Sequence, residues 1–184
     1  MGVKNNTRIL FTQQDIKEKV QSLAKDIAKD IEGEDLLAIS LLRGSFIFAA
    51  DLIREISNYT DKKIEIDFIT TSSYGDEEKS AGIVDIISDV RSQVRGRNIL
   101  IIDDILDSGY TMNYVQNHLR EKNPLSIKTV TLLDKPSRRK VDIKSDYVGF
   151  VIDDLFIVGY GLNYGKYYRN IPYIYCYEWK NKKI

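Results

Sequence analysis

The chain has 184 residues, a length that suits a single domain spanning residues 1–184 with a core of its own. Its 27 Lys and Arg residues balance 27 Asp and Glu residues, so charge gives no reason to expect a nucleic acid or an acidic membrane as partner. The one cysteine, Cys176, cannot form an internal disulfide, and the first residues lack an apolar signal segment. We therefore expect a cytoplasmic protein with no membrane partner.

The first half of the chain predicts helices and strands in turn. Thr12 and Asp15 have the spacing of a helix capping box, and apolar residues then recur on one helical face until Gly33. The polar, charged segment 72–82 is expected to be a mobile loop. Before and after it we predict, in chain order, a strand over 36–42, a turn over 43–45, a helix over 46–56, and strands over 64–71 and 83–88.

The second half continues the alternation, with Pro124 ending a helix. The predicted elements are a strand over 98–102, a helix over 110–121, and strands over 127–133, 147–152, 155–160 and 173–177. This order predicts an α/β fold with a central, mostly parallel sheet flanked by helices. The N- and C-terminal segments are expected to form a small hood lobe over its active edge.

The segment 98–111 carries the strongest chemical signal. Its apolar run ends in two carboxylates, Asp103 and Asp104, and a third, Asp107, opens a turn of small residues. Ligands of open α/β sheets bind beyond the carboxyl ends of the strands, and a turn that leads into a helix offers N–H groups to a phosphate. Neighbouring strand residues point to opposite faces, so both carboxylates act together only if the strand ends before them. Solubility or helix capping would also explain these acids.

This segment resembles the motif of type I phosphoribosyltransferases that binds phosphoribosyl pyrophosphate (PRPP), in which the first acid is usually Glu rather than Asp103. The resemblance implies the fold of that family. It also implies that Asp103 and Asp104 contact the ribose hydroxyls and the metal shell of PRPP, and that Asp107 is the general acid or base near the purine N7. The implied 5′-phosphate site consists of Asp107, Ser108, Gly109, Tyr110 and Thr111.

Further segments, from about Leu42 to Pro172, resemble the hypoxanthine-guanine members of the family in the same order. They imply a lid loop that contains Ser73 and Tyr74. A plain strand-to-helix turn, a surface lysine and a core phenylalanine would explain several of these residues equally well without the family context. The implied pyrophosphate site is Arg43, Gly44, Ser45 and Arg169, and the implied purine site is Lys135, Phe156 and Ile157.

The resemblance also implies Mg²⁺ as cofactor, with a first ion held by Asp103 and Asp104, partly through ribose and water. A second ion in the family depends on an Asp at the position of Asn163. Asn keeps an oxygen and loses the charge, so we expect weaker binding of the second ion or an altered base preference.

The implied reaction is purine salvage, in which the 5-phosphoribosyl group of PRPP moves to N9 of hypoxanthine or guanine. Lys135 offers only donors and would select a 6-oxopurine over adenine. The resemblance further implies a homodimer or homotetramer, and the tyrosines near the C-terminus suit a packing or subunit surface. Two alternatives are a PRPP-binding transcriptional regulator and a phosphoacceptor receiver domain. The balanced charge disfavours the first, and the glycine turn disfavours the second.

Overall fold

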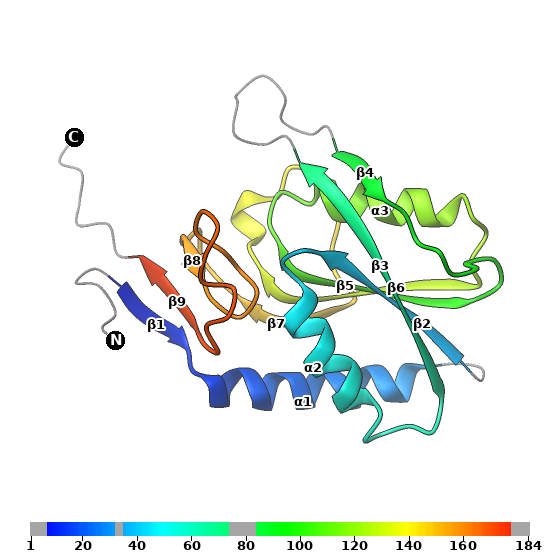
Figure 1. The fold of residues 1–184 in the computed structure, drawn as a ribbon, viewed down its shortest axis with the longest axis horizontal. Coiled ribbons are helices and arrows are strands. Elements are labelled where there is room, and N and C mark those ends of the chain that lie inside the picture. Colours follow the sequence, from blue (N-terminus) through cyan, green and yellow to red (C-terminus); the bar gives the residue numbers. More distant parts are fainter. Residues whose placement is uncertain (1–6, 32–34, 74–83, 178–184) are drawn as a thin grey trace.

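The structure of the protein is a computed structural model that describes residues 7–31, 35–73 and 84–177. Its main element is a six-stranded sheet, parallel except for the antiparallel pair of its first two strands (Figure 1). This confirms the predicted central, mostly parallel sheet. The strands lie in the order β4 (Val84–Ser88), β3 (Lys63–Ser73), β2 (Asp35–Leu42), β5 (Asn98–Leu106), β6 (Ser126–Asp134) and β7 (Tyr147–Val151).

Helices cover both faces of this sheet because the central strands are apolar on both sides. In β2, Ala38 packs toward α1 (Gln13–Asp30) and α2 (Phe46–Ile56), whereas its neighbours Leu37 and Ile39 pack toward α3 (Tyr110–Arg120). The period of two along the strand therefore divides the core into two layers. Within the described residues no helix is long and apolar enough to cross a membrane.

The helix that was predicted to begin after Thr12 is confirmed in detail. The Thr12 hydroxyl accepts a hydrogen bond from the Asp15 N–H (3.2 Å), and the Asp15 carboxylate accepts one from the Thr12 N–H (2.8 Å). This reciprocal pair is the capping box. The helix ends at Asp30, and Gly33, the expected end, lies outside the described residues.

A second sheet joins the two ends of the chain. It contains β1 (Thr7–Phe11), β9 (Ile174–Tyr177) and β8 (Ile157–Val158), and both strand pairs are antiparallel. Figure 1 shows it at the end of the molecule toward which β2 points. The strand β1 was not predicted, and the strand predicted over 155–160 is wrong in extent, because only Ile157 and Val158 pair with β9.

Candidate active site

The turn after β2 is held by buried hydroxyl groups. Ser45 is fully buried, its Oγ lies 2.7 Å from Ser40 Oγ, and it donates a hydrogen bond to the carbonyl of Leu41 (2.5 Å). A Cβ on Gly44 would lie 1.9 Å from Asp104 Oδ2. A larger residue at this position would therefore displace the carboxylate, and the turn predicted from the sequence lies against Asp104.

The acidic pair lies inside β5 rather than after it. The strand was predicted to end at Ile102, but its pairing with β6 continues through Asp103 to Leu106. The expectation that the strand ends before them is therefore wrong, yet both carboxylates are buried and close enough to affect each other's pKa. Of the two, Asp104 lies against Gly44, near the carboxyl end of β5.

Burial raises the pKa of both carboxyl groups. The neighbouring charge of Asp104 raises the pKa of Asp103 further. For Asp104, burial again dominates, while hydrogen bonds, including one with Asp103, and the Arg169 guanidinium act in the lowering direction. Two buried acids with one cation nearby favour a ligand that supplies positive charge or hydrogen-bond donors.

The turn after β5 leads directly into α3. Its residue Gly109 has φ +90°, and a Cβ there would lie 2.6 Å from Ile143 Cγ2, so the position requires glycine. Gly109 is the N-cap residue, and no side chain caps the first turn, which contains Tyr110 and Thr111. Ser108 is fixed through its carbonyl, which accepts a hydrogen bond from the Lys140 N–H (2.9 Å). The helix N-terminus therefore presents the N–H groups that an anion requires.

Asp107 does not cap that helix but belongs to a cluster of charges. Its Oδ1 accepts a hydrogen bond from Arg138 Nε (2.8 Å), and its Oδ2 lies 4.0 Å from Lys135 Nζ. Both cations also approach Asp154, at 3.3 Å and 3.8 Å. No role for Arg138 or Asp154 was predicted from the sequence, and only the basic run around Arg138 could have indicated one.

Lys135 is not a solvated surface lysine. It is buried and donates a hydrogen bond to the carbonyl of Leu155 (2.7 Å), immediately before Phe156. Phe156 is 42% exposed and meets Tyr164 edge to face, with 5.5 Å between ring centroids. An aromatic ring that is 42% exposed is unlike a plain core position. Ile157 is buried in β8.

The segment after β8 brings Arg169 back to the turn that contains Gly44. Arg169 Nη1 donates to the carbonyl of Gly161 (2.5 Å), and the Gly161 N–H donates to the carbonyl of Arg169 (2.9 Å). A Cβ on Gly161 would lie 2.1 Å from the Gly44 carbonyl oxygen. Asn163 is exposed and donates to the carbonyl of Gly165 (2.7 Å), so its amide is bonded within its own turn.

The predicted site residues therefore fall into two neighbouring groups. Gly44, Asp104 and Arg169 lie together, as do Asp107 and Lys135. Of the two predicted lid residues, Ser73 is the last residue of β3, and Tyr74 lies outside the described residues.

The Asp103 and Asp104 carboxylates fit a magnesium ion that is bound mainly through the phosphate oxygens of a substrate. Within the described ranges, no group of three His, Cys, Asp or Glu residues could hold a metal by itself. Mg²⁺ does not need such a cage, because it keeps several waters and takes one or two carboxylates together with phosphate oxygens. The buried pair of Asp103 and Asp104 supplies two carboxylates.

Comparisons with known proteins agree with this geometry. Residues 6–165 match the model of the phosphoribosyl transferase domain. The chain is 47% identical to the hypoxanthine-guanine phosphoribosyltransferase of Bacillus subtilis, over 91% of each chain, and 40% identical to the hypoxanthine phosphoribosyltransferase of Escherichia coli K12, over 94% of this chain and 96% of that one. A crystal structure of a hypoxanthine-guanine phosphoribosyltransferase from Bacillus anthracis matches with a TM-score of 0.86 at 43% identity, over 94% and 99% of the two chains.

Proposed function

The chain belongs to the phosphoribosyl transferase family, and we propose that it transfers the 5-phosphoribosyl group from PRPP to N9 of hypoxanthine and of guanine. The products are inosine or guanosine monophosphate and pyrophosphate. The observation that carries this proposal is the position of Lys135: its buried ammonium group lies 4.0 Å from Asp107 Oδ2 and donates a hydrogen bond to the carbonyl of Leu155, the residue before the exposed Phe156. Such a group can recognise a purine beside the PRPP turn.

PRPP would bind along the carboxyl end of β5. Its 5′-phosphate would bind at the turn Ser108–Thr111. There Gly109 adopts a positive φ and carries no side chain, and the first turn of α3 offers N–H groups. Asp103 and Asp104 would accept hydrogen bonds from the ribose hydroxyls. These donors would compensate the burial of two like charges.

The departing pyrophosphate would lie between the turn Arg43–Ser45 and Arg169. Gly44 of this turn lies against the Asp104 carboxylate, and the charge of Arg169 acts to lower the pKa of the same carboxyl group. The buried hydroxyl bonds of Ser45 keep the turn in place, which is the preorganisation that stabilises developing negative charge. A planar guanidinium suits two phosphate oxygens at once.

Mg²⁺ would be held by Asp103 and Asp104 and would neutralise the charge that develops on the pyrophosphate oxygens. A second ion would depend on Asn163, whose neutral and exposed amide binds a metal less well than a carboxylate. We therefore assign only the first ion to buried protein donors.

The purine would stack on Phe156 and use main-chain groups of Ile157. Lys135 would donate to the 6-oxo group, whereas adenine would present an amino group, a second donor, to an ammonium group that cannot accept a hydrogen bond. Asp107 would hold a proton shared with the purine N7, using Oδ2, because Oδ1 accepts the bond from Arg138. Since the transferred ribosyl group resembles an oxocarbenium ion, catalysis would consist mainly of positioning and electrostatics.

Four features remain predictions. The single domain over 1–184 and the cytoplasmic location were predicted from length and composition. The lid role of the loop that contains Ser73 and Tyr74, and the homodimer or homotetramer, were predicted from the family resemblance.

The test is an ultraviolet assay of the full chain with PRPP and Mg²⁺ against hypoxanthine, guanine, xanthine and adenine in parallel. We expect turnover of hypoxanthine and guanine and none of adenine. Lys135→Ala should raise the KM for hypoxanthine about tenfold or more, since a buried charged hydrogen bond is lost. Lys128→Ala is the matched control, because Lys128 lies on β6, the strand directly before Lys135, and has an exposed side chain. No turnover of any base, or turnover of adenine, would contradict the proposal.

A further inference from the structure

Tyr160 adopts a backbone conformation that a tyrosine rarely takes. Its φ is +48°, in the left-handed region, and its side chain is buried at 6% exposure. A bulky residue with positive φ is strained and persists only where its surroundings hold it. In Tyr160 the hydroxyl provides such a hold, because it donates a 2.6 Å hydrogen bond to Asp51 Oδ2.

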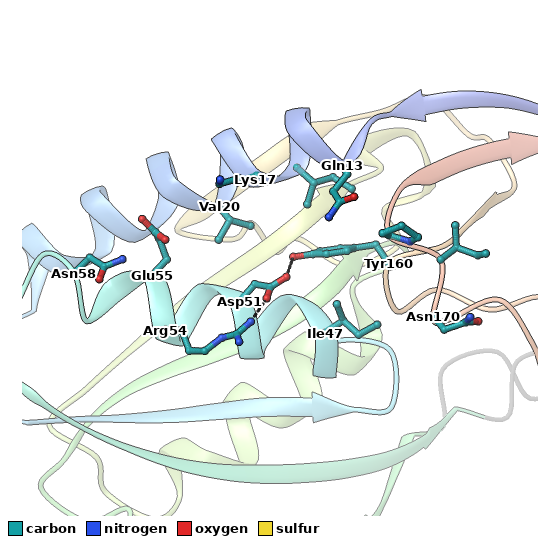
Figure 2. Close-up of a pocket in the computed structure, with 13 residues that line it drawn as sticks. Gln13, Lys17, Val20, Ile47, Asp51, Arg54, Glu55, Asn58, Tyr160 and Asn170 are labelled. Atoms are coloured by element: carbon teal, nitrogen blue, oxygen red, sulfur yellow. Dashed lines mark hydrogen bonds and ion pairs between the residues drawn. The ribbon is translucent and has the colours of Figure 1, made fainter.

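Figure 2 shows this hydrogen bond at the wall of a cavity of about 650 Å³ between α1, α2 and the segment 170–172. The Tyr160 ring lies across the cavity with its hydroxyl toward Asp51, and Arg54 approaches the same carboxylate from α2. Burial, followed by the bond to Asp51, raises the pKa of the Tyr160 hydroxyl above its ordinary value. The hydroxyl therefore stays protonated and donating throughout the neutral pH range.

The residue after Tyr160 connects this bond to the candidate pyrophosphate site. Gly161 has φ +102° and packs so closely against the Gly44 carbonyl that a Cβ would lie 2.1 Å from its oxygen. Gly161 also exchanges two hydrogen bonds with Arg169, through its N–H and its carbonyl. A change in the backbone at Tyr160 would therefore move Gly161 relative to both Gly44 and Arg169.

The acceptor side of the bond leads to the same place. Asp51 lies on α2, and the N-cap of α2 is Ser45, the last residue of the turn that contains Gly44. The bond thus links two segments 109 residues apart in sequence, each of which presents one wall of the pyrophosphate site. A bond of this kind sets the spacing between the two walls.

We propose that Tyr160 is a positioning residue for the pyrophosphate site, and that its hydrogen bond to Asp51 holds Arg169 and the Gly44 turn at the separation that PRPP requires. This inference rests on the proposed function, in particular on the pyrophosphate role of Arg43–Ser45 and Arg169. Tyr160 itself is not assigned as a catalytic residue, because its hydroxyl is bonded to Asp51 on α2. Its loss should affect the binding of PRPP and of pyrophosphate and leave the binding of the purine unchanged.

The test measures KM for PRPP, KM for hypoxanthine and inhibition by pyrophosphate in Tyr160→Phe. We expect the KM for PRPP to rise about tenfold, as a hydrogen bond to a charged group is lost. Inhibition by pyrophosphate should weaken by a similar factor, while the KM for hypoxanthine stays within about twofold. The matched control is Tyr147→Phe, because the Tyr147 hydroxyl donates an equally short bond (2.6 Å) to Asp30, at the far end of α1.

Substitutions of the acceptor separate positioning from general stability. Asp51→Asn keeps an oxygen that can accept the Tyr160 bond and should restore most of the affinity for PRPP, whereas Asp51→Ala should behave like Tyr160→Phe. Arg54→Ala removes the ion pair with Asp51, leaves the Tyr160 bond in place and should keep the wild-type KM.

The outcomes are distinguishable from a failure of the proposed function. If the wild-type chain is active and Tyr160→Phe has the wild-type KM for PRPP, the positioning role is wrong and the proposed function stands. An equal rise of both KM values in Tyr160→Phe would also overturn the positioning role. If the wild-type chain transfers no phosphoribosyl group, the proposed function fails and this inference fails with it.

Discussion

Replacing Gly44 with Ala tests whether the first turn and the acidic pair form one site. The new Cβ would lie 1.9 Å from Asp104 Oδ2, and Cβ contacts below 3.0 Å essentially never occur. The turn is fixed by the buried Ser45, so the Asp104 carboxylate must move by about 1 Å, a misplacement that can cost about 100-fold in rate. We expect kcat/KM for PRPP to fall about 100-fold and stability to fall by about 1–3 kcal/mol from overpacking.

The measurement is kcat/KM for PRPP at saturating hypoxanthine, together with the free energy of unfolding in urea. Gly96→Ala is the control, since Gly96 has φ +72° and, among the described residues, no heavy atom lies within 4 Å of the position that its Cβ would take. Its left-handed backbone should cost about 1–2 kcal/mol without any effect on activity. If Gly44→Ala retains wild-type kcat/KM, the close approach of the turn to Asp104 has no catalytic importance and the reasoning is refuted.

Three further predictions concern charge. Asp107→Asn should lower kcat about 100-fold or more, with the affinity for PRPP nearly unchanged, because Asn keeps the shape of the side chain and an oxygen that can accept the Arg138 bond but cannot take up a proton; unchanged turnover in stopped assays would exclude the acid/base role. Asn163→Asp should strengthen the Mg²⁺ dependence of the rate or change the guanine to hypoxanthine ratio, and a magnesium titration with no change in either would make this residue neutral. In Asp67, burial raises the pKa but hydrogen bonds from three backbone N–H groups outweigh it, so the pKa is lowered. A lowered folded-state pKa stabilises the fold above about pH 4, and this stabilisation is lost as pH falls through the folded-state value. Asp67→Asn should therefore be less stable than wild type at pH 7, with a difference that shrinks in urea unfolding at acid pH.

Local signals in the sequence were sufficient for the helices and most of the parallel strands. The Thr12–Asp15 capping box involves residues three apart, and the two faces of β2 follow from its unbroken apolar run. Both features depend on neighbours along the chain, which is why they could be predicted without knowledge of the tertiary structure.

The end of β5 could not be predicted, since carboxylates usually mark the end of a buried strand. Asp103 stays in the sheet because Thr131 of β6 continues the pairing, and Asp104 is accepted in the interior because Gly44 leaves it space. Both reasons are contacts with distant segments. The motif indicated the chemistry of Asp103 and Asp104, but it could not indicate that their backbone stays in the strand.

The second sheet and the links around the site depend on still longer separations. The strand β1 pairs with β9, with Thr7 opposite Tyr177, and its own sequence has no strong strand pattern. The Tyr160–Asp51 bond and the Arg138–Asp107 bond likewise join residues far apart in the chain. Such contacts become visible only when the fold is known.

The central claim is that the turns after β2 and β5, together with Lys135, form one PRPP and 6-oxopurine site. A crystal structure with PRPP, Mg²⁺ and a 6-oxopurine analogue that has carbon in place of N9 tests it most directly, since transfer cannot occur. We predict the 5′-phosphate on Ser108–Thr111, the pyrophosphate between the Gly44 turn and Arg169, and the 6-oxo group within hydrogen-bond distance of Lys135 Nζ. A purine bound away from Lys135, or a 5′-phosphate bound away from the N-terminus of α3, would contradict the account.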